Sequence, residues 1–310
     1  MKSLRQILAS ATREADHRWA LATLVRTTGS TYRKPGARLL VAPDGTTTGV
    51  LSGGCLEEEI GRIAQGVLAS GQHEFIEFDT RKLYGCAGKL GIFIEKIPAA
   101  GTTGNFLTEM AAKLESRQLC RTRTVFSKNG RSEILPDKAL VVESPDSFVQ
   151  TVPLPTRLLL FGNGPEIPPI RLFAAGLGWS AKTHTHPDEL PENFGPDAQT
   201  AAIVMTHNFG RDLASLDRLL PMGLPYLGLL GPKRRHAELL ARFREYRELD
   251  PAWLNNLHAP AGLDIGSESP EEIALSIISE AAAVLAKREG GHLSARAGSV
   301  HQPRALSKEA

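Results

Sequence analysis

Cysteine and aromatic residues are scarce in this chain of 310 residues, and each shortage excludes a class of protein. The three cysteines, Cys55, Cys86 and Cys120, are odd in number and irregularly spaced, which excludes a disulfide framework and a paired-cysteine zinc site. Free thiols of this kind are typical of a reducing cytosol. Aromatic residues make up 6% of the chain, which argues against a protein that stacks the bases of single-stranded nucleic acid.

The chain also lacks an excess of charge of one sign and any long apolar run. Its 36 basic and 34 acidic residues leave a net charge of +2, which gives no general attraction to nucleic acid or to a membrane surface. Apolar runs stay well short of the roughly 18 residues of a membrane span, and early charges exclude a secretory signal. With 42% hydrophobic and 23% charged residues, we expect a soluble, cytoplasmic globular protein of one large or two ordinary domains.

The most informative stretch of the sequence runs from Thr47 to Ile60 and reads TTGVLSGGCLEEEI. A short apolar run leads into Ser52-Gly53-Gly54-Cys55, and a segment with helical apolar spacing follows at once. Paired glycines before a helix let the backbone approach a ligand, and the helix start offers unpaired N–H groups. The helix dipole acidifies a thiol at that point, which favours a nucleophilic or metal-binding Cys55. The alternative is a glycine-rich turn with a small buried cysteine.

Strands and loops of one small sheet are predicted on both sides of this stretch. A strand ends at Gly29-Ser30, a basic loop with Arg33 and Arg38 follows, and Asp44-Gly45 predicts a hairpin. Downstream, another strand leads to a second glycine–cysteine cluster, which contains Cys86 and reads YGCAGKLGIFIEKI. Since both clusters adjoin strands of the same predicted sheet, we expect Cys55 and Cys86 to face a shared cleft.

The order of these motifs resembles the xanthine dehydrogenase accessory proteins, an XdhC/CoxI-like family that handles the molybdenum cofactor. The matching motifs are Gly29-Ser30-Thr31-Tyr32-Arg33, Gly36-Ala37, Asp44-Gly45, Ser52-Gly53-Gly54-Cys55-Leu56-Glu57 and Cys86-Ala87-Gly88. The family often has proline where this chain has Tyr32 and glycine where it has Ala87. Neither departure removes a polar or sulfur group, and the resemblance covers most of residues 15–97.

A second domain is predicted after Ser144 to Thr156, a segment with three prolines and little periodicity that we interpret as a linker. A buried apolar strand then runs into Gly162-Asn163-Gly164, a helix and a second strand, which is the pattern of a dinucleotide-binding fold. We therefore predict an α/β protein in which an N-terminal mixed-sheet domain (1–153) precedes a Rossmann-type doubly wound domain (154–290). The tail, 291–310, is expected to be disordered.

The dinucleotide fingerprint of this second domain is incomplete. Its third glycine position holds Ile167, and Pro168-Pro169 occupy the first helical turn. After the second strand, Thr185 and His186 stand where a ribose-binding acid is expected, and Asp188 comes too late. Binding of NAD(P) is therefore expected to be weak or absent.

Later loops of the second domain carry polar and basic residues. One strand ends at Thr206-His207, and another is followed by a helix that opens with Lys233, Arg234 and Arg235. Basic residues oppose the dipole at a helix start, and a docked anion would reverse that effect. Since parallel strands end at the same edge, these loops and the glycine loop should ring one crevice. The alternative for the three cations is a solvated charged face.

The second half also resembles the C-terminal Rossmann domain of the same family. The matching stretches are Phe161-Gly162-Asn163-Gly164, Met205-Thr206-His207, Gly228-Leu229-Leu230-Gly231 with Arg234-Arg235, Gly262-Leu263-Asp264-Ile265-Gly266 and Pro270-Glu271-Glu272-Ile273-Ala274. The last of these opens a helix with Ser269 as the predicted N-cap and a capping box completed by Glu272.

The resemblance implies a maturation chaperone rather than a catalyst. It binds the molybdenum cofactor (a molybdopterin) as cargo, protects it while a cysteine desulfurase installs a sulfido ligand, and inserts it into an apo xanthine dehydrogenase-type hydroxylase. A homodimer is a further implied assembly. The cofactor-binding residues that we predict are Gly29, Ser30, Arg33, Arg38, Ser52, Gly53, Gly54, Cys55, Glu57, Cys86, Gly162, Gly164, Thr206, His207, Lys233, Arg234, Arg235 and Asp264. Cys55 and Cys86 are also the predicted contacts to molybdenum or sulfur.

Two functions of other classes stay open at this point. The first is a Rossmann oxidoreductase that uses NAD(P), with Cys55 or His207 in its chemistry. The second is an interaction module that regulates the dehydrogenase without binding a ligand. A pterin carried by the purified protein would separate the chaperone from both.

Overall fold

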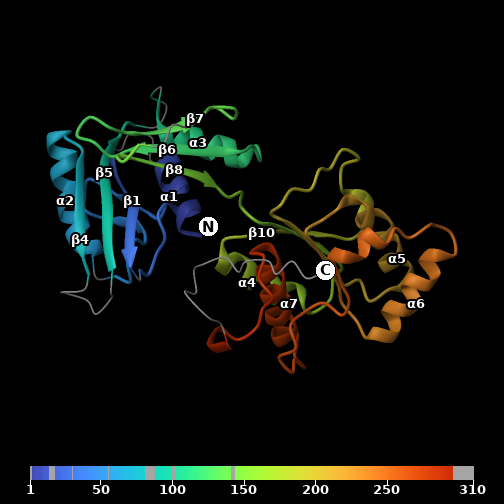
Figure 1. The fold of residues 1–310 in the computed structure, drawn as a ribbon. Helices are drawn as coiled ribbons and strands as arrows, with labels where there is room; N and C mark the ends of the chain where they lie inside the picture. Colours follow the sequence, from blue (N-terminus) through green and yellow to red (C-terminus); the bar gives the residue numbers. More distant parts are fainter. Residues whose placement is uncertain are drawn as a thin grey trace. The chain divides into compact units, whose positions relative to one another are not determined.

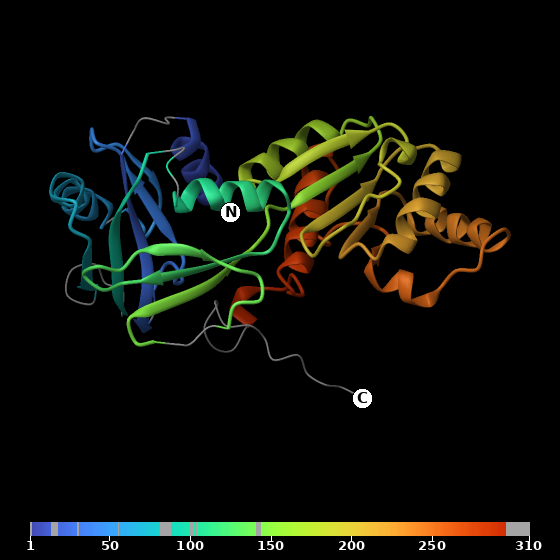
Figure 2. The same cartoon turned by 90° about the horizontal axis from the view of Figure 1, so that it is seen from above.

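The computed structural model describes residues 2–13, 18–29, 31–54, 56–80, 88–99, 102, 104–140 and 144–295. The chain divides into two compact units, Met1–Leu154 and Pro155–Ala310, which are described one at a time (Figures 1 and 2). None of the helices in these described ranges is long and apolar enough to cross a membrane.

Unit 1 contains a five-stranded antiparallel sheet with the order β3-β2-β1-β5-β4. Its strands are β1 (Trp19–Gly29), β2 (Arg38–Val41), β3 (Thr47–Gly49), β4 (Glu74–Asp79) and β5 (Gly88–Ile97). Alternate residues of β1, such as Ala22 and Leu24, pack against α2 (Glu57–Ser70). The hairpin predicted at Asp44-Gly45 is confirmed by the pairing of β2 with β3.

A second, three-stranded antiparallel sheet of unit 1 has the order β7-β6-β8. Its strands are β6 (Cys120–Val125), β7 (Ser132–Leu135) and β8 (Ser147–Val152). Together with α1 (Lys2–Arg13) and α3 (Phe106–Glu115), β6 and β8 form a second apolar cluster that includes Leu21 and Leu40 of the first sheet.

Two predictions for unit 1 are wrong. The segment interpreted as a linker contains β8, because its prolines bound a strand without interrupting it. Pro145 precedes β8, and Pro153 follows it. All described strand pairs of unit 1 are antiparallel, so its sheets are not mixed.

Unit 2 is a doubly wound parallel sheet with the order β10-β9-β11-β12-β13, which confirms the predicted Rossmann-type fold. Its strands are β9 (Arg157–Phe161), β10 (Ser180–His184), β11 (Thr200–Val204), β12 (Tyr226–Leu229) and β13 (Leu257–His258), and only β13 was not predicted. One face packs against α4 (Ile167–Leu177) and α7 (Pro270–Leu285), and the other against α5 (Phe209–Leu219) and α6 (Lys233–Arg244).

Short helices and caps complete unit 2. The 3₁₀ segments are η1 (Pro187–Glu189), η2 (Leu220–Met222), η3 (Pro251–Asn256) and η4 (Leu293–Ala295). The capping box predicted for Ser269 and Glu272 is present at the start of α7. This helix ends at Leu285, and Lys287 has the left-handed φ of 55° that closes it. Most of the tail predicted to be disordered, 296–310, lies outside the described residues.

Candidate functional site

The glycine loop before α2 is shaped by one carboxylate. Glu57 accepts hydrogen bonds at Oε1 from the backbone N–H groups of Leu51 (3.1 Å) and Ser52 (2.7 Å). Its Oε2 accepts from the Ser52 hydroxyl (2.6 Å) and from the N–H of Leu56 (3.2 Å). Partial burial raises the pKa of Glu57, but the hydrogen bonds from Ser52 and Leu51 outweigh it and hold the pKa below 4.5. Glu57 therefore builds the loop, and its oxygens are largely occupied.

The two glycines of this loop face solvent. Gly53 and Gly54 are exposed, and a Cβ built on either residue would have no neighbouring atom within 4 Å. Ser52, by contrast, is buried under the loop at 8% exposure. A ligand could thus approach the backbone at the two glycines from one open side. Cys55, which follows them, lies outside the described residues, as do Ser30 and Cys86, so the shared-cleft prediction stays a prediction.

The basic loop predicted near Gly29 is divided between surface and core. Arg33 is half-buried, and its backbone oxygen accepts a hydrogen bond from Thr31. Arg38 is 4% exposed, because β2 is buried on both of its faces. Burial lowers the pKa of Arg38 to about 10, and the nearby Glu95 carboxylate opposes this shift. A guanidinium buried in this way is not open to a ligand, so the described structure contradicts the prediction of Arg38 as a cofactor-binding residue.

Arg38 lies in a polar layer between the two sheets of unit 1. Its guanidinium donates to the Gly36 carbonyl (3.3 Å) and lies over the Phe106 ring at 5.6 Å. The buried carboxylate of Glu95 accepts from the backbone N–H (2.8 Å) and hydroxyl (2.5 Å) of Ser132, while burial raises its pKa. The Glu95–Ser132 bonds join β5 to β7, and Arg38 packs on α3 through Phe106, which indicates a structural role for Arg38.

In unit 2, four loops meet at the carboxyl edge of the parallel sheet. The N–H of Gly162 donates to the His184 carbonyl (3.1 Å), that of Met205 to Phe161 (2.8 Å), and that of Leu230 to Val204 (2.9 Å). Only glycine fits at position 162, where φ is 143° and a Cβ would lie 2.3 Å from the Met205 carbonyl oxygen. The glycine loop and the loops after β10, β11 and β12 therefore share one edge, as predicted.

A buried carboxylate and a histidine lie over the glycine loop. Glu166 Oε2 and His207 Nε2 are 3.4 Å apart, with side chains that are 8% and 54% exposed. A Cβ built on Gly164 would lie 2.4 Å from that oxygen and 2.8 Å from that nitrogen. His207 has a left-handed φ of 55°, a conformation that is costly outside glycine and is often found at functional sites. The sequence predicted His207 and missed Glu166.

A second buried carboxylate joins the loop after β11 to the start of α6. Asp212 is 1% exposed, and its Oδ1 accepts from the hydroxyl (2.6 Å) and the N–H (3.1 Å) of Thr206. Its Oδ2 forms an ion pair with Arg235 at 2.6 Å. Thr206 and Arg235 are thus brought together as predicted, but through an aspartate that holds both of them. The Arg235 side chain therefore links α6 to Asp212, and its charge is already paired.

The other two cations at the start of α6 are exposed. The Arg234 side chain is 90% exposed and forms an ion pair with Glu238, one turn along the helix, at 2.9 Å. Lys233 is exposed and has no ion pair with another described residue. The N-cap, Pro232, has no side-chain hydrogen bond to the helix start. The cations and the helix dipole of this turn make the carboxyl edge positive beside the end of β12.

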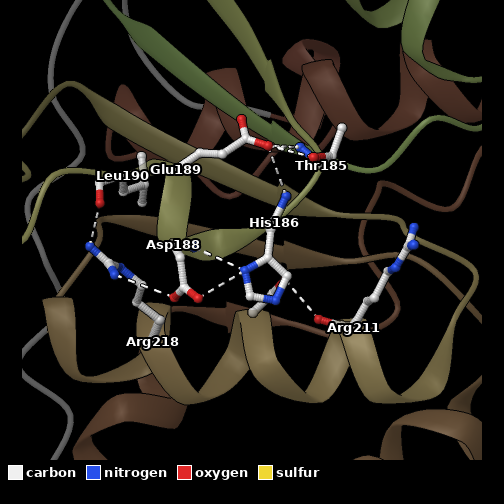
Figure 3. A network of polar contacts seen from close by, with 8 residues as sticks. Thr185, His186, Asp188, Glu189, Leu190, Arg211 and Arg218 are labelled. Carbon is white, nitrogen blue, oxygen red and sulfur yellow. Dashed lines mark hydrogen bonds and ion pairs between the residues drawn. The ribbon is translucent and has the colours of Figure 1, made fainter.

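An acid does lie beside the end of β10, where none was predicted. Glu189 reaches back so that its Oε1 accepts from Thr185 (N–H at 2.9 Å, hydroxyl at 2.5 Å) and from the His186 N–H at 3.2 Å (Figure 3). The hydrogen bonds from Thr185 lower the pKa of Glu189 to about 2. Because η1 folds Glu189 onto its own loop, this carboxylate shapes the loop, and a ribose would have to displace those bonds.

The remaining predicted residue, Asp264, is on the loop that leads to α7. This loop is anchored by the Gly262 N–H, which donates to Glu280 (2.8 Å), and by the Ser276 hydroxyl, which donates to the Leu263 carbonyl (2.5 Å). Asp264 is exposed and, within the described part of the chain, has no hydrogen bond or ion pair with another predicted site residue. Its assignment to the site stays a prediction.

Comparison with known families decides the identity of both units. The XdhC and CoxI family matches residues 12–79, and the XdhC Rossmann domain matches residues 158–281. The chain belongs to the XdhC and CoxI family. The first matched segment contains Glu57, and the second contains Glu166, Asp212 and Asp264, whereas Cys86 lies between the two segments.

Relatives extend this XdhC and CoxI assignment over most of the chain. A Bacillus subtilis (strain 168) protein described as a probable xanthine dehydrogenase subunit is 28% identical, over 84% of this chain and 91% of the relative. The molybdenum cofactor insertion chaperone PaoD of Escherichia coli (strain K12) is 25% identical, over 87% of this chain and 84% of PaoD.

A solved structure supports the fold of this XdhC and CoxI family member. The crystal structure of a protein described as a xanthine dehydrogenase from Bacillus halodurans has a TM-score of 0.78 at 25% identity. The match covers 93% of this chain and 97% of that chain. The family resemblance is confirmed, and so is the predicted α/β fold class with a Rossmann-type second unit, although the sheets of unit 1 are antiparallel.

Proposed function

We propose that this protein binds the molybdenum cofactor as cargo and inserts it into a xanthine dehydrogenase-type hydroxylase. Its relative PaoD is described as a molybdenum cofactor insertion chaperone, and the alignment to PaoD spans most of both chains. The Bacillus subtilis relative is described as a probable component of xanthine dehydrogenase, which fits a protein that works beside such an enzyme. In this proposal the hydroxylase is the partner that receives the cargo.

The structural observation that carries the proposal is the positive start of α6 at the carboxyl edge of unit 2. In open α/β sheets ligands bind at this edge, and a helix start favours a phosphate. Lys233 and Arg234 are exposed there, while the Thr206–Asp212–Arg235 contacts hold the surrounding loops in place. We assign the terminal phosphate of the molybdopterin to this turn.

The exposed glycine loop of unit 1 is a separate candidate for binding the cargo. Gly53 and Gly54 leave the backbone open to a ligand, and Cys55 follows them in the sequence. We propose that this loop meets the molybdenum or its sulfur ligands and that a cysteine desulfurase acts while the cargo is held. Protection during sulfuration is then part of the same binding function.

The test of this function is whether the purified protein carries a pterin and can deliver it. Protein produced in cells that make the cofactor is oxidised, and the released pterin is measured by its fluorescence. The loaded protein is then mixed with an apo-hydroxylase, whose recovered activity measures delivery. We expect both a pterin and recovered activity, and an interaction module without a ligand would show neither.

The oxidoreductase alternative is tested in the same preparation. Its strongest support is the Glu189 carboxylate beside the end of β10, but this carboxylate already accepts three hydrogen bonds from its own loop. Titration calorimetry with NADH is expected to give no binding in the micromolar range. Micromolar binding of NADH together with the absence of pterin would favour the oxidoreductase.

A further inference from the structure

The helix that follows the first strand of unit 2 offers few backbone donors at its start. In dinucleotide-binding folds these donors hold the pyrophosphate. Here the N–H of Ile167 donates to the Gly164 carbonyl (3.2 Å), and that of Ile170 donates to the Glu166 carbonyl (3.0 Å). Between them lie Pro168 and Pro169, which have no N–H. From Ile167 to Ile170, the start of α4 is therefore poorly suited to bind a phosphate.

A carboxylate occupies the same position. Glu166 is the N-cap residue of α4, but its side chain makes no capping hydrogen bond. It turns back over Gly164 instead, where a Cβ would lie 2.4 Å from its Oε2. A buried carboxylate repels a phosphate, and it is costly to bury unless it is hydrogen-bonded. The space over Gly164 is thus suited to a ligand that donates hydrogen bonds and unsuited to one that carries negative charge.

Glu166 has acceptor capacity to spare. A carboxylate has about four lone-pair directions. Among the described residues its only hydrogen-bond partner is His207, at 3.4 Å, which is long for a bond to a charged group. The carboxylates of Glu57 and Asp212 accept several shorter bonds each. Glu166 therefore differs from the carboxylates of Glu57 and Asp212 in having unused acceptor capacity.

The opposite end of the same edge has the opposite chemistry. The helix start at Lys233 and Arg234 follows β12, and β11 is the only strand between β12 and β9. Two strand spacings separate the ends of β9 and β12 by about 10 Å. The carboxyl edge of unit 2 thus has an acceptor at one end and a positive charge at the other. A ligand that fits both ends has hydrogen-bond donors at one end and a phosphate at the other.

We propose that Glu166 recognises the pterin ring of the cargo by its donor edge, an inference that rests on the proposed function. The 2-amino-4-oxopyrimidine part of a pterin presents a ring N–H beside an exocyclic NH₂, and two parallel N–H···O bonds from such a pair fit one carboxylate. The phosphate at the far end of the molybdopterin then lies at the start of α6. His207 is the positioning residue that keeps Glu166 turned over Gly164.

The experiment is a fluorescence titration of the full chain with free pterin (2-amino-4-oxopteridine) and with lumazine, its 2,4-dioxo analogue. Lumazine places a carbonyl where pterin has its amino group, so it cannot form the same pair of bonds. We expect the wild type to bind pterin about tenfold more tightly than lumazine, the effect of one hydrogen bond to a charged group. Glu166→Gln should abolish this preference, because an amide offers the ring one acceptor and one clashing donor.

Two further variants keep the test clear. Glu192→Gln changes an exposed glutamate of unit 2 and should retain the preference. Gly164→Ala should abolish it, since the added Cβ displaces the Glu166 and His207 side chains. Thermal unfolding of each variant shows whether it is folded. If Glu166→Gln fails to fold, Gly164→Ala alone decides the outcome.

Several results would overturn the inference, and they differ from those that would overturn the proposed function. Equal pterin preference in the wild type and Glu166→Gln removes the role of Glu166, even if co-purified pterin upholds the function. If chelation of divalent cations lowers pterin binding by the wild type as much as Glu166→Gln does, Glu166 and His207 are metal ligands instead. No binding of free pterin by the wild type also rejects the inference, and absence of co-purified pterin rejects the function itself.

Discussion

The glycine loop before α2 and the glycine loop before α4 each lie next to a glutamate, Glu57 in unit 1 and Glu166 in unit 2. Glu57 accepts hydrogen bonds from the loop itself, through both of its oxygens. Among the described residues, Glu166 accepts only from His207, which it faces across the space over Gly164. The same residue type at the start of a helix can therefore build a loop or offer an acceptor to a ligand, and the contacts decide which.

A third carboxylate, Asp212 near the start of α5, belongs with Glu57. Its two oxygens accept hydrogen bonds from Thr206 and Arg235, and it is nearly inaccessible to solvent. The comparison is thus between closed carboxylates, whose loss should cost stability, and an open one, whose loss should cost binding. Substitutions at these positions can break that distinction.

The largest effect on stability is expected for Asp212→Ala. It leaves Thr206 without its acceptor and the partly buried Arg235 without its counter-ion, and loss of one partner of a buried pair costs about 3 kcal/mol. Chemical denaturation of the full chain measures this loss. Asp217→Ala, which removes a more exposed partner from Arg247, is the matched control and should cost less than about 1 kcal/mol. Equal losses for the two variants would contradict the closed role of Asp212.

A smaller loss is expected for Glu57→Gln. An amide in place of the carboxylate turns one acceptor into a donor facing the N–H groups of Ser52 or Leu56, which should cost about 1–2 kcal/mol. Glu58, the next residue in the same helical turn, is exposed, so Glu58→Gln is the control and should change the free energy of unfolding little. If both variants behave alike, Glu57 does not hold the loop.

The stabilisation from Glu57 should also depend on pH. Its folded-state pKa lies below the ordinary value of 4.5, so its contribution is complete above the unfolded pKa and is lost as the pH falls through the folded one. The difference in thermal midpoint between the wild type and Glu57→Gln should be constant near pH 7 and shrink below about pH 4.5. A difference that grows on acidification would give the pKa shift the wrong sign.

The contrast between Glu57 and Glu166 also marks how far the sequence can predict the site. Glycines, strand ends and the basic start of α6 follow local patterns, and they predicted the Rossmann-type fold and the edge at which its loops meet. The direction of a side chain does not follow from such patterns. Glu166 lies only two residues after Gly164. An acid so close to a glycine loop is unfavourable for binding a phosphate there, and this local signal could have predicted Glu166 as a site residue.

Long-range packing explains the other differences. Arg38 reads as part of a basic loop, but it is the first residue of β2 and lies in the core near Glu95. Both faces of β2 are buried by parts of the chain distant in sequence, which a local pattern does not show. β8 was missed because prolines on both sides resemble a linker, although the six residues of the strand pair with β6. Glu189 was missed because η1 brings it back over four residues to Thr185.

For Glu166→Gln, the open carboxylate, the expected change in stability is small. The substitution removes a buried charge whose one described partner is 3.4 Å away, so the free energy of unfolding should change by less than about 1 kcal/mol in either direction. Chemical denaturation beside Glu57→Gln tests the comparison directly. A loss as large as that of Asp212→Ala would place Glu166 among the closed carboxylates and weaken its proposed role toward the pterin.

The smallest effect on stability is expected for the double charge reversal Lys233→Glu/Arg234→Glu. Both side chains are exposed. Arg234 forms an ion pair with Glu238 on the same helix, and Lys233 forms none with a described residue, so the thermal midpoint should stay nearly unchanged. Arg235 is left intact because it holds the buried Asp212, and its reversal would mix stability with binding. Two acidic residues at the start of α6 should instead repel the phosphate of the cargo and lower the amount of co-purified pterin.

Arg242→Glu/Arg244→Glu, at the other end of α6, is the matched control with the same change in net charge and should retain the pterin. Both reversals are compared by pterin fluorescence and by delivery to the apo-hydroxylase. If Lys233→Glu/Arg234→Glu retains the pterin but no longer delivers it, the start of α6 is a docking surface for the hydroxylase. The phosphate would then lie elsewhere, and the positive end of the carboxyl edge would no longer fix the direction in which the cargo lies.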